Sequence, residues 1–463
     1  MAMVSIPEKW DYEADVIIVG AGTAGLPAAT VAAEAGAKVA VLELMSYCAS
    51  SLALVNVGPA FAGTDAQKEQ GVEDLPEHYY KDGIELAKGV PEIWRTFTDN
   101  QLDTYYWCKE IGVKFGELFA PPAHTRKRGF FLKGTDMLRV LEKTAKGKGV
   151  EVLFLHRATR LITDPQTGRV LGLKVKAKDK TERNFKANRA VILATGGFGR
   201  NSEMVEEYGP KFIDWVPTMP PGHLGDGLKM ALAVGAGTKD LGHAVVGSFS
   251  IDVVSKTGVM DFVGYAGGIF VNVNGQRFWD EATRTSFYGL LTEKGMEQPG
   301  GFFYVVFDDK AKNKVRPGKL GKAKPYQADT IEELAGKAGI DPKRLKETID
   351  KYNGDIKSVG FDTVFDRRTL EGCEGTPLTI DTPPFYAVKC KGSTSSFKGG
   401  LKINTSCQVV NQYDEVIPGL YAAGEVTGGL WGAHGTYLPC TMVTAAMTFG
   451  RIAGKNASAD KPW

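Results

Sequence analysis

Cysteine is scarce in this chain of 463 residues, and its placement excludes several kinds of site. The six cysteines form no CxxC pair, no CxxCH haem-attachment motif and no zinc-binding spacing. They stand at Cys48, Cys108, Cys373, Cys390, Cys407 and Cys440. We therefore expect reduced cysteines, mostly in the core, and no haem, iron–sulfur cluster or metal site.

Long hydrophobic runs and an excess of one charge are also absent. No apolar stretch approaches the roughly 20 residues that span a bilayer, and residues 1–12 lack the hydrophobic segment of a secretory signal. The formal net charge of +2 is too balanced to recruit nucleic acid or an anionic membrane. We predict a cytoplasmic protein that binds a small molecule and has neither nucleic acid nor membrane as a partner.

The strongest motif lies in the stretch 15–43. The apolar run at 16–19 is typical of a strand buried on both faces, and glycines follow it in the GxGxxG spacing. Such glycines permit a tight turn, an approach of the backbone to a pyrophosphate, and close packing of the next helix on the strand. The residues of this turn are Gly20, Gly22, Ala24 and Gly25. The motif predicts a dinucleotide-binding unit.

An acid closes the same unit. Glu43 ends the second buried strand about 20 residues after the glycines, where a carboxylate accepts hydrogen bonds from a ribose and repels a 2′-phosphate. Pro27 in the first helical turn and Gly36 after the helix agree with these boundaries. The pattern favours FAD or NAD over NADP.

A second strand end with glycines follows a predicted hairpin. The strand 190–194 ends at Thr195 and Gly196, and a helix then opens at Gly225-Asp226-Gly227. We expect these residues to cover the same dinucleotide as the first turn.

A third strand end, GLYAAGE at 419–425, contains Gly424 and Glu425 and leads toward a closing helix that begins near Thr441. The start of that helix offers unpaired N–H groups to an electron-rich ring or a carbonyl. We therefore add Gly424, Glu425 and Thr441 to the candidate cofactor-binding residues.

Composition divides the chain, which is large enough for two or three domains. Near residue 240 glycines, aromatic residues and short alternating segments begin to dominate. We predict a dinucleotide-binding domain in two parts, 1–239 and 385–463, and an inserted domain at 240–384. The basic segment with His124, Arg126, Lys127 and Arg128 is interpreted as a solvated loop.

Taken together, these segments resemble the flavoprotein family of soluble fumarate reductases, 3-ketosteroid dehydrogenases, aspartate oxidases and their relatives. The markers occur in order along nearly the whole chain: GAGTAG with Glu43, ATGGFGRNSEM, GDGLKMALAVGA, FVNVNGQRFWDE, PPFYAVK and PGLYAAGEVTGG. The resemblance implies an α/β fold, in which a Rossmann-like FAD-binding domain is split by an inserted α+β cap domain. It also implies FAD as the cofactor.

The resemblance assigns roles to individual residues. It places Glu43 at the adenosine ribose, Ser50 and Ser51 beside the flavin, and Glu425 at the ribityl chain. Further FAD-lining positions are Gly20, Gly22, Gly25, Thr195, Gly196 and Asp226. The histidine that tethers FAD in some relatives has no counterpart at 48–52, so we expect non-covalent binding.

The substrate positions depart from the reductase pattern. Fumarate reductases grip a dicarboxylate with paired arginines and histidines, whose geometry suits carboxylates. Here Ser396 replaces one histidine, and the other falls near Gly247. An arginine position is taken by Gly435 or Tyr437. Only Arg284 lies near the arginine that donates a proton in reductases, one residue out of register.

The segment TYLPCTMVTAAMTFG at 436–450 is more similar to the ketosteroid and tricarballylate dehydrogenases of the family. Tyr437 and Arg284 are therefore the candidate catalytic residues. Cys440 stands where a glycine or another small residue is usual.

These observations predict an FAD-dependent dehydrogenase or reductase that acts on a CH–CH or C=C bond beside a carbonyl, with a neutral or monoanionic substrate. Two alternatives remain: a fumarate-reductase-like reductase of an unsaturated acid, and a flavin electron carrier without its own substrate. No second dinucleotide motif serves the other electron-transfer step. The expected electron partner is therefore an external donor or acceptor.

Overall fold

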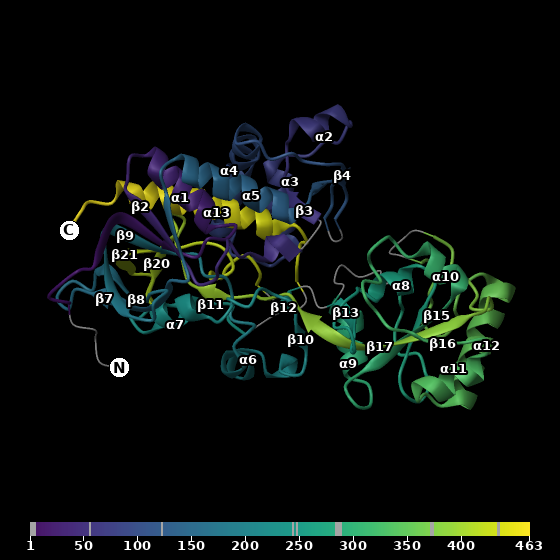
Figure 1. Cartoon of the computed structure of the whole chain (residues 1–463). Coiled ribbons are helices and arrows are strands. Elements are labelled where there is room, and N and C mark those ends of the chain that lie inside the picture. The colour runs from purple at the N-terminus through teal and green to yellow at the C-terminus, as the bar shows by residue number, and fades with distance from the viewer. Residues whose placement is uncertain are drawn as a thin grey trace. The chain divides into compact units, whose positions relative to one another are not determined.

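A computed structural model of the chain describes residues 6–54, 57–121, 124–242, 245–246, 249–282, 289–370, 375–432 and 436–463 (Figure 1). The chain divides into two compact units. The first comprises Met1–Ile213, Met219–Val245 and Ser396–Trp463, and the second comprises Asp214–Thr218 and Val246–Ser395. The first unit therefore contains the N-terminal glycine turn and the third glycine-containing strand end.

An eight-stranded sheet forms the first unit, with the order β20-β21-β9-β1-β2-β6 and the β7–β8 hairpin attached to β9. Neighbouring strands from β21 to β6 run parallel. The strands are β1 (Tyr12–Val19), β2 (Val39–Glu43), β6 (Glu151–Phe154), β7 (Arg157–Thr163), β8 (Val170–Lys176), β9 (Glu182–Leu193), β20 (Gln408–Val410) and β21 (Val416–Ala422). Their parallel carboxyl ends, where the three predicted glycine-containing segments lie, meet at one edge of the sheet.

Two helices from opposite ends of the sequence pack together against this sheet: α1 (Gly25–Glu34) and α13 (Thr441–Ala459) (Figure 1). Small residues allow the close approach. A Cβ atom on Gly450 would lie 2.3 Å from the carbonyl oxygen of Ala24, and one on Gly454 would lie 2.2 Å from that of Ala28. The glycines of α13 are therefore a packing requirement.

Further elements complete the first unit. Its helices include α2 (Asp65–Glu69), α3 (Pro76–Glu85), α4 (Pro91–Glu110), α5 (Gly134–Gly147), α6 (Ser202–Tyr208) and α7 (Asp226–Leu232). A small sheet contains β3 (Val57–Ala60), β4 (Leu118–Phe119) and β5 (Gly129–Phe131). Short strands are β11 (Thr238–Lys239), β18 (Ser396–Phe397) and β19 (Gly400–Leu401), while β12 (Val245–Val246) spans the boundary between the units in the sequence.

The second unit is built around β17 (Phe385–Thr394), which pairs with strands on both sides. Its other strands are β10 (Val216–Pro217), β13 (Phe249–Asp252), β14 (Ile269–Val271), β15 (Phe303–Asp308) and β16 (Tyr326–Ala328). The helices are α8 (Asp261–Tyr265), α9 (Gly289–Met296), α10 (Asp309–Lys314), α11 (Ile331–Ala338) and α12 (Pro342–Val359). The predicted domain boundary at 384/385 falls at the start of β17, whereas the second compact unit ends at Ser395, after β17.

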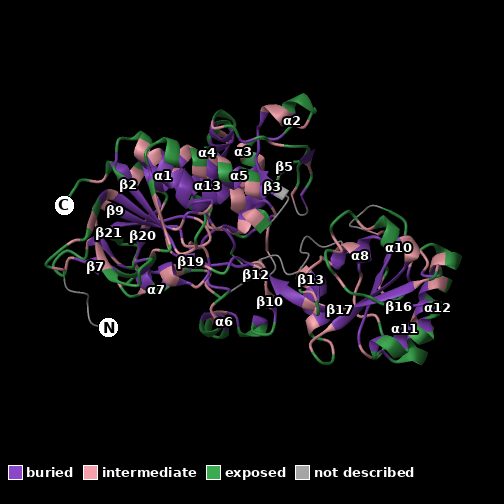
Figure 2. Cartoon of the chain, viewed as in Figure 1, coloured by how far each residue is buried: buried purple, intermediate pink, exposed green. Residues whose placement is uncertain are grey.

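Alternation along these strands gives the second unit two hydrophobic clusters. In β15, Tyr304 and Val306 belong to one cluster, while Val305 and Phe307 belong to the other. Successive side chains of a strand point to opposite faces, so the sheet is buried on both sides, as the purple strands in Figure 2 show. Within the described residues, no helix is long and apolar enough to cross a membrane.

Candidate cofactor site

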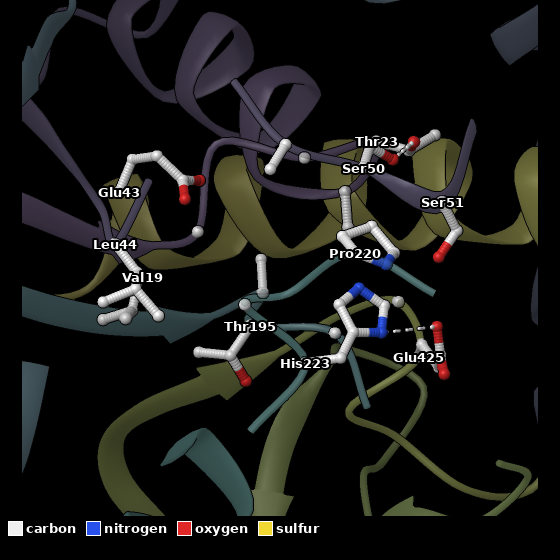
Figure 3. A pocket seen from close by; sticks show the side chains of 18 of the residues that line it. Val19, Thr23, Glu43, Leu44, Ser50, Ser51, Thr195, Pro220, His223 and Glu425 are labelled. Carbon is white, nitrogen blue, oxygen red and sulfur yellow. Dashed lines mark hydrogen bonds and ion pairs between the residues drawn. The ribbon is translucent and has the colours of Figure 1, made fainter. Parts of the chain in front are cut away.

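One pocket at the carboxyl ends of the parallel strands collects most of the predicted cofactor residues (Figure 3). The space within the pocket, including its opening to solvent, is about 980 Å³. The predicted residues that line it are Gly20, Gly22, Ala24, Glu43, Ser50, Ser51, Thr195, Gly196, Asp226, Gly424 and Glu425. Segments far apart in the sequence thus form a single elongated site.

The glycines of the turn are needed for two different reasons: contacts within the protein at Gly20 and Gly25, and space in the pocket at Gly22. Gly20 has φ +109°, and a Cβ there would lie 2.3 Å from the carbonyl oxygen of Ala194. A Cβ on Gly25 would lie 1.9 Å from the carbonyl oxygen of Gly20. Gly22 differs, since the nearest protein atom to its Cβ would be 3.4 Å away. Its missing side chain instead leaves pocket space beside the backbone, as a bound pyrophosphate requires.

Glu43 closes one end of the pocket. Its carboxylate accepts a hydrogen bond of 2.9 Å from the Ala21 N–H and one of 2.8 Å from the Met45 N–H. Burial raises the pKa of Glu43, and these backbone donors oppose that rise. Each oxygen keeps lone pairs for further donors, so the group can accept hydrogen bonds from two ribose hydroxyls.

The opposite end of the pocket is formed by Ser51, His223 and Glu425 (Figure 3). His223 Nδ1 lies 3.6 Å from Glu425 Oε2. Burial lowers the pKa of His223 to about 4 and raises that of Glu425 to about 8. Both groups are therefore mainly uncharged near neutral pH. His223 had no role in the sequence analysis because no local motif marks it.

Three buried polar atoms along the pocket have no hydrogen-bond partner among the described residues. They are Ser51 Oγ, Thr195 Oγ1 and His223 Nδ1. Buried polar groups are nearly always hydrogen-bonded, so these atoms indicate a polar ligand that satisfies them. Together with the glycine cradle and Glu43, they fit a dinucleotide such as FAD.

A charged pair borders the pocket near the start of β7. Arg157 donates two hydrogen bonds to Asp226, of 2.7 and 2.8 Å. Arg157 and its neighbour His156 also line the pocket, although the sequence analysis gave neither a role. The family resemblance predicts Asp226 as an FAD-lining residue, and its carboxylate accepts both hydrogen bonds from this arginine.

Two predicted cofactor residues are not among those that line the pocket. Gly25 packs α1 against the glycine turn, and the Thr441 hydroxyl lies 2.7 Å from that of Tyr79. Met442 and Val443, the next residues of α13, line the pocket instead. The first turn of α13 therefore faces the site, as expected of its N–H groups, but through the residues that follow Thr441.

Of the two candidate catalytic residues, only Tyr437 belongs to the described part of the chain. Its ring packs edge-to-face on Trp431, with centroids 5.0 Å apart, in the segment that leads into α13. Burial raises the pKa of Tyr437, and the neighbouring Cys440 and Glu425 add to the rise. Arg284 lies outside the described residues, as do Gly247 and Gly435.

A buried lysine adjoins this segment and was missed by the sequence analysis. Lys398 is 1% exposed, and its ammonium donates a hydrogen bond to the carbonyl of Thr436. It follows Phe397, whose N–H bonds to Glu425 and lowers the pKa of that acid. In the sequence, Lys398 is only a single lysine before Gly399-Gly400, and such a pattern does not predict burial or a function.

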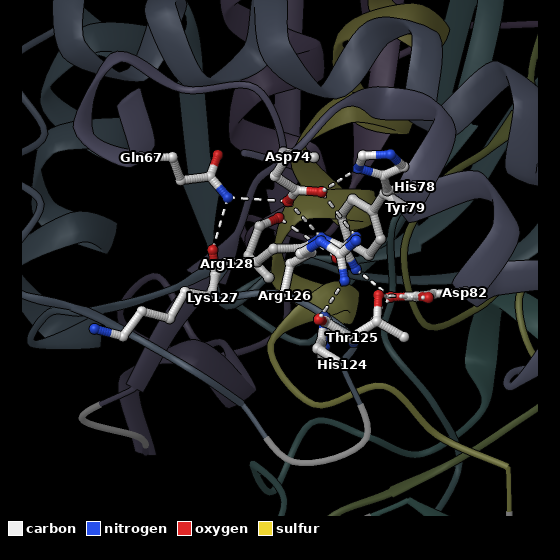
Figure 4. A network of polar contacts seen from close by, with 12 residues as sticks. Gln67, Asp74, His78, Tyr79, Asp82, His124, Thr125, Arg126, Lys127 and Arg128 are labelled. Carbon is white, nitrogen blue, oxygen red and sulfur yellow. Dashed lines mark hydrogen bonds and ion pairs between the residues drawn. The ribbon is translucent and has the colours of Figure 1, made fainter. Parts of the chain in front are cut away.

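The interpretation of 124–128 as a solvated loop is wrong for Arg128, which is fully buried. Its guanidinium donates hydrogen bonds of 2.6 and 3.0 Å to Asp74 and a further one to Asp82 (Figure 4). The carboxylates come from elsewhere in the chain, so the basic segment alone could not reveal the pairing. Arg126 and Lys127 are exposed, as predicted.

The fold and the pocket define a dinucleotide-binding flavoprotein, and comparison with known proteins identifies its family. The model of the family described as "FAD binding domain" matches residues 15–440. The chain is 32% identical over 454 residues to a fumarate reductase (cytochrome) of Shewanella frigidimarina, covering 96% of this chain and 77% of the relative. The chain belongs to this family of FAD-dependent oxidoreductases.

Solved structures agree. The open conformation of a flavocytochrome c3 fumarate reductase superposes with a TM-score of 0.87 at 29% identity, covering 97% of this chain and 78% of that chain. A 3-ketosteroid-Δ4-(5α)-dehydrogenase from Rhodococcus jostii RHA1 gives 0.77 at 25% identity and 98% coverage of both chains. These findings confirm the predicted resemblance, the fold class, FAD as the cofactor, and membership of the dehydrogenases and reductases that act on CH–CH and C=C bonds.

Proposed function

We propose that this protein oxidises or reduces a carbon–carbon bond next to a carbonyl in a neutral or singly charged, partly apolar substrate, such as a cyclic ketone. The main support is that Ser396 stands where fumarate reductases of the family have a histidine, and that Gly435 or Tyr437 stands where they have an arginine. A dianion needs several fixed positive charges to offset the desolvation of its carboxylates. Arg128 is already committed to Asp74 and Asp82.

Tyr437 is proposed as the group that exchanges a proton with the carbon next to the carbonyl. Its raised pKa keeps the phenol protonated near neutral pH, which suits donation better than abstraction. This argues for reduction as the direction in which Tyr437 acts most readily. Arg284 is the alternative proton carrier.

The first turn of α13 is proposed to polarise the substrate carbonyl. Backbone N–H groups at a helix start carry partial positive charge, and Met442 and Val443 bring this turn to the pocket. FAD, when bound, supplies hydride donation or acceptance at the neighbouring carbon. The chain's own contribution is to orient the carbonyl and to place a proton donor near it.

The residues proposed to hold FAD are those of the pocket. Glu43 would accept from the ribose, Gly20 and Gly22 would admit the pyrophosphate, and Glu425 would lie near the ribityl chain. Non-covalent attachment is proposed because no histidine occurs at 48–52. Release of FAD into the supernatant on acid precipitation would support it, whereas flavin that stays with the protein would exclude it.

The second unit is proposed to select the substrate, and an external donor or acceptor is proposed to complete the electron transfer. The domain limits 1–239, 240–384 and 385–463 and a cytoplasmic location remain predictions. Steady oxidation of NADH by the purified protein alone, with substrate present, would contradict the external partner.

The main test uses the absorbance of bound FAD. The protein is bleached with a reductant and then mixed with a panel of enones and unsaturated acids. Reoxidation by a cyclic enone much faster than by air supports the proposal, and the same reaction in Tyr437→Phe should be slowed by about 10²-fold or more with FAD retained. If no compound outpaces air, the electron-carrier alternative is favoured.

A second candidate function is reduction of an unsaturated dicarboxylate, because the matched flavocytochrome relative is named as a fumarate reductase. Tight binding of fumarate or malonate that is lost in Arg284→Ala would establish this candidate over the first. Weak inhibition by both dicarboxylates, unchanged in Arg284→Ala, would exclude it.

A further inference from the structure

His223 and Glu425 lie at one end of the FAD pocket, where two glycines without side chains leave room for them. A Cβ on Gly196 would lie 2.6 Å from His223 Nε2, and one on Gly197 would lie 2.4 Å from Glu425 Oε1. The imidazole and the carboxyl group therefore pack against the backbone of Gly196 and Gly197, which follow β9. With His223 Nδ1 at 3.6 Å from Glu425 Oε2, they form a buried pair that faces the cofactor space.

Within the described part of the chain, the charged groups near this pair have partners of their own, and the ammonium of the buried Lys398 donates a hydrogen bond to the carbonyl of Thr436. Arg200 lowers the pKa of His223, and its Nε is bound to the carbonyl of Met219 at 2.9 Å. Asp226 is neutralised by Arg157. Burial raises the pKa of Tyr437, and Cys440 and Glu425 add to the rise, so the phenol stays protonated. Among the groups named in this paragraph, and within the described residues, the His223–Glu425 pair has no committed counter-charge.

Electrons that enter a buried cofactor bring negative charge into a site of low dielectric, where an added charge is costly unless it is compensated. The unpartnered Nδ1 of His223 is a neutral base at that end of the pocket. Protonation of the imidazole would supply the missing positive charge without any movement of the backbone.

We propose that the His223–Glu425 pair binds one proton from solvent when FAD in this pocket takes up two electrons, and releases it when the electrons leave. The electrons come from the external donor, and the proton comes from water. One imidazole N–H bond forms, and no bond between the protein and the cofactor forms or breaks. His223 thereby adds one proton per two electrons to the pH dependence of the cofactor's midpoint potential.

This inference rests on the FAD site and not on the substrate class proposed above. A failure of the enone assay would leave it standing, and a failure of the potential measurement would leave the substrate proposal standing. The two are therefore tested separately.

The test is spectroelectrochemical titration of the FAD-loaded protein from about pH 5 to about pH 8. Each additional proton bound per two electrons steepens the potential by about 30 mV per pH unit. We expect the wild type to be steeper by that amount than His223→Asn, which keeps a polar amide near Nδ1 but cannot titrate. Equal slopes at equal FAD content would overturn the proposal.

The matched control is His156→Asn. His156 lines the same pocket, but its Nδ1 is 2.8 Å from the carbonyl of Phe154 and it stands near Glu43. It should retain the wild-type slope, and an equal loss of slope in both variants would overturn the assignment to His223.

Should His223→Asn not retain FAD, the wild type decides the question. In protein labelled with ¹⁵N-histidine, the imidazole nitrogens of one residue should shift to the protonated position on reduction. Unchanged imidazole shifts would overturn the proposal.

Discussion

The hydroxyl groups of Tyr79 and Thr441 lie 2.7 Å apart, which joins α3 to the first turn of α13. The guanidinium of Arg128 lies 4.5 Å over the ring of Tyr79, and His124 bonds to the carbonyl of Pro439 at 2.8 Å. The buried polar network of Figure 4 therefore supports the helix start that faces the FAD pocket.

Replacement of Arg128 by leucine should destabilise the protein by about 3–5 kcal/mol, because it leaves the carboxylates of Asp74 and Asp82 buried without their cation. The matched control is Arg126→Leu on the same segment, where the side chain is exposed and the expected change is within about 0.5 kcal/mol. Urea unfolding measures both. Similar unfolding midpoints for the two variants would contradict the structural role of Arg128.

Acid should weaken the fold partly through His124. Burial lowers its pKa from 6.5 to about 4, so the native state keeps it neutral. Its contribution to stability is present above the unfolded pKa and is lost as the pH falls from 6.5 toward about 4, because the unfolded chain then binds the proton first. We expect thermal unfolding midpoints of His124→Asn to fall less over this range than those of the wild type. Parallel profiles would refute the assignment.

The glycine turn should tolerate no side chain at Gly25. A methyl group there would lie 1.9 Å from the Gly20 carbonyl oxygen, so Gly25→Ala should cost about 1–3 kcal/mol or more and abolish FAD binding. Gly354→Ala is the control, since its Cβ would meet nothing within 4 Å on the exposed face of α12, and it should stabilise by up to about 1 kcal/mol. FAD content after purification distinguishes the two, and a flavin-loaded Gly25→Ala protein would disprove the packing argument.

Lys398 should act through the segment that carries Tyr437. Loss of its hydrogen bond to Thr436 in Lys398→Met is expected to lower turnover by about 10-fold with FAD retained. The effect should vanish in a Tyr437→Phe background if Lys398 only positions that phenol. Lys402→Met, which removes an ion pair of 2.8 Å with Asp414, is the control and should leave turnover unchanged. Additive losses in the double variant would exclude the positioning role.

The cofactor site was largely predictable because its parts are local. A strand, three glycines and an acid at fixed spacing specify a backbone shape, and Gly20 and Glu43 lie where that spacing places them. The positions of Thr195 and Glu425 were predicted in the same way, because each lies beside a glycine at the end of a predicted strand. Such positions depend on short-range geometry, which a sequence expresses directly.

The residues that were missed depend on contacts between distant segments. The burial of Arg128 requires Asp74 and Asp82, and the role of His223 requires Glu425, about 200 residues later. The pairing of β17 with β15 and β13 likewise joins segments far apart in the sequence. Tertiary partners of this kind leave no periodic signal in the chain.

The close packing of α1 on α13 also fixes when the cofactor can be captured. The pocket takes Gly20, Gly22 and Ala24 from the beginning of the chain, but Gly424, Glu425 and Val443 from near its end. A ribosome must therefore synthesise the chain through the second unit and as far as the first turns of α13 before all the walls of the pocket exist. FAD loading is accordingly expected only after α13 has been made and has packed on α1.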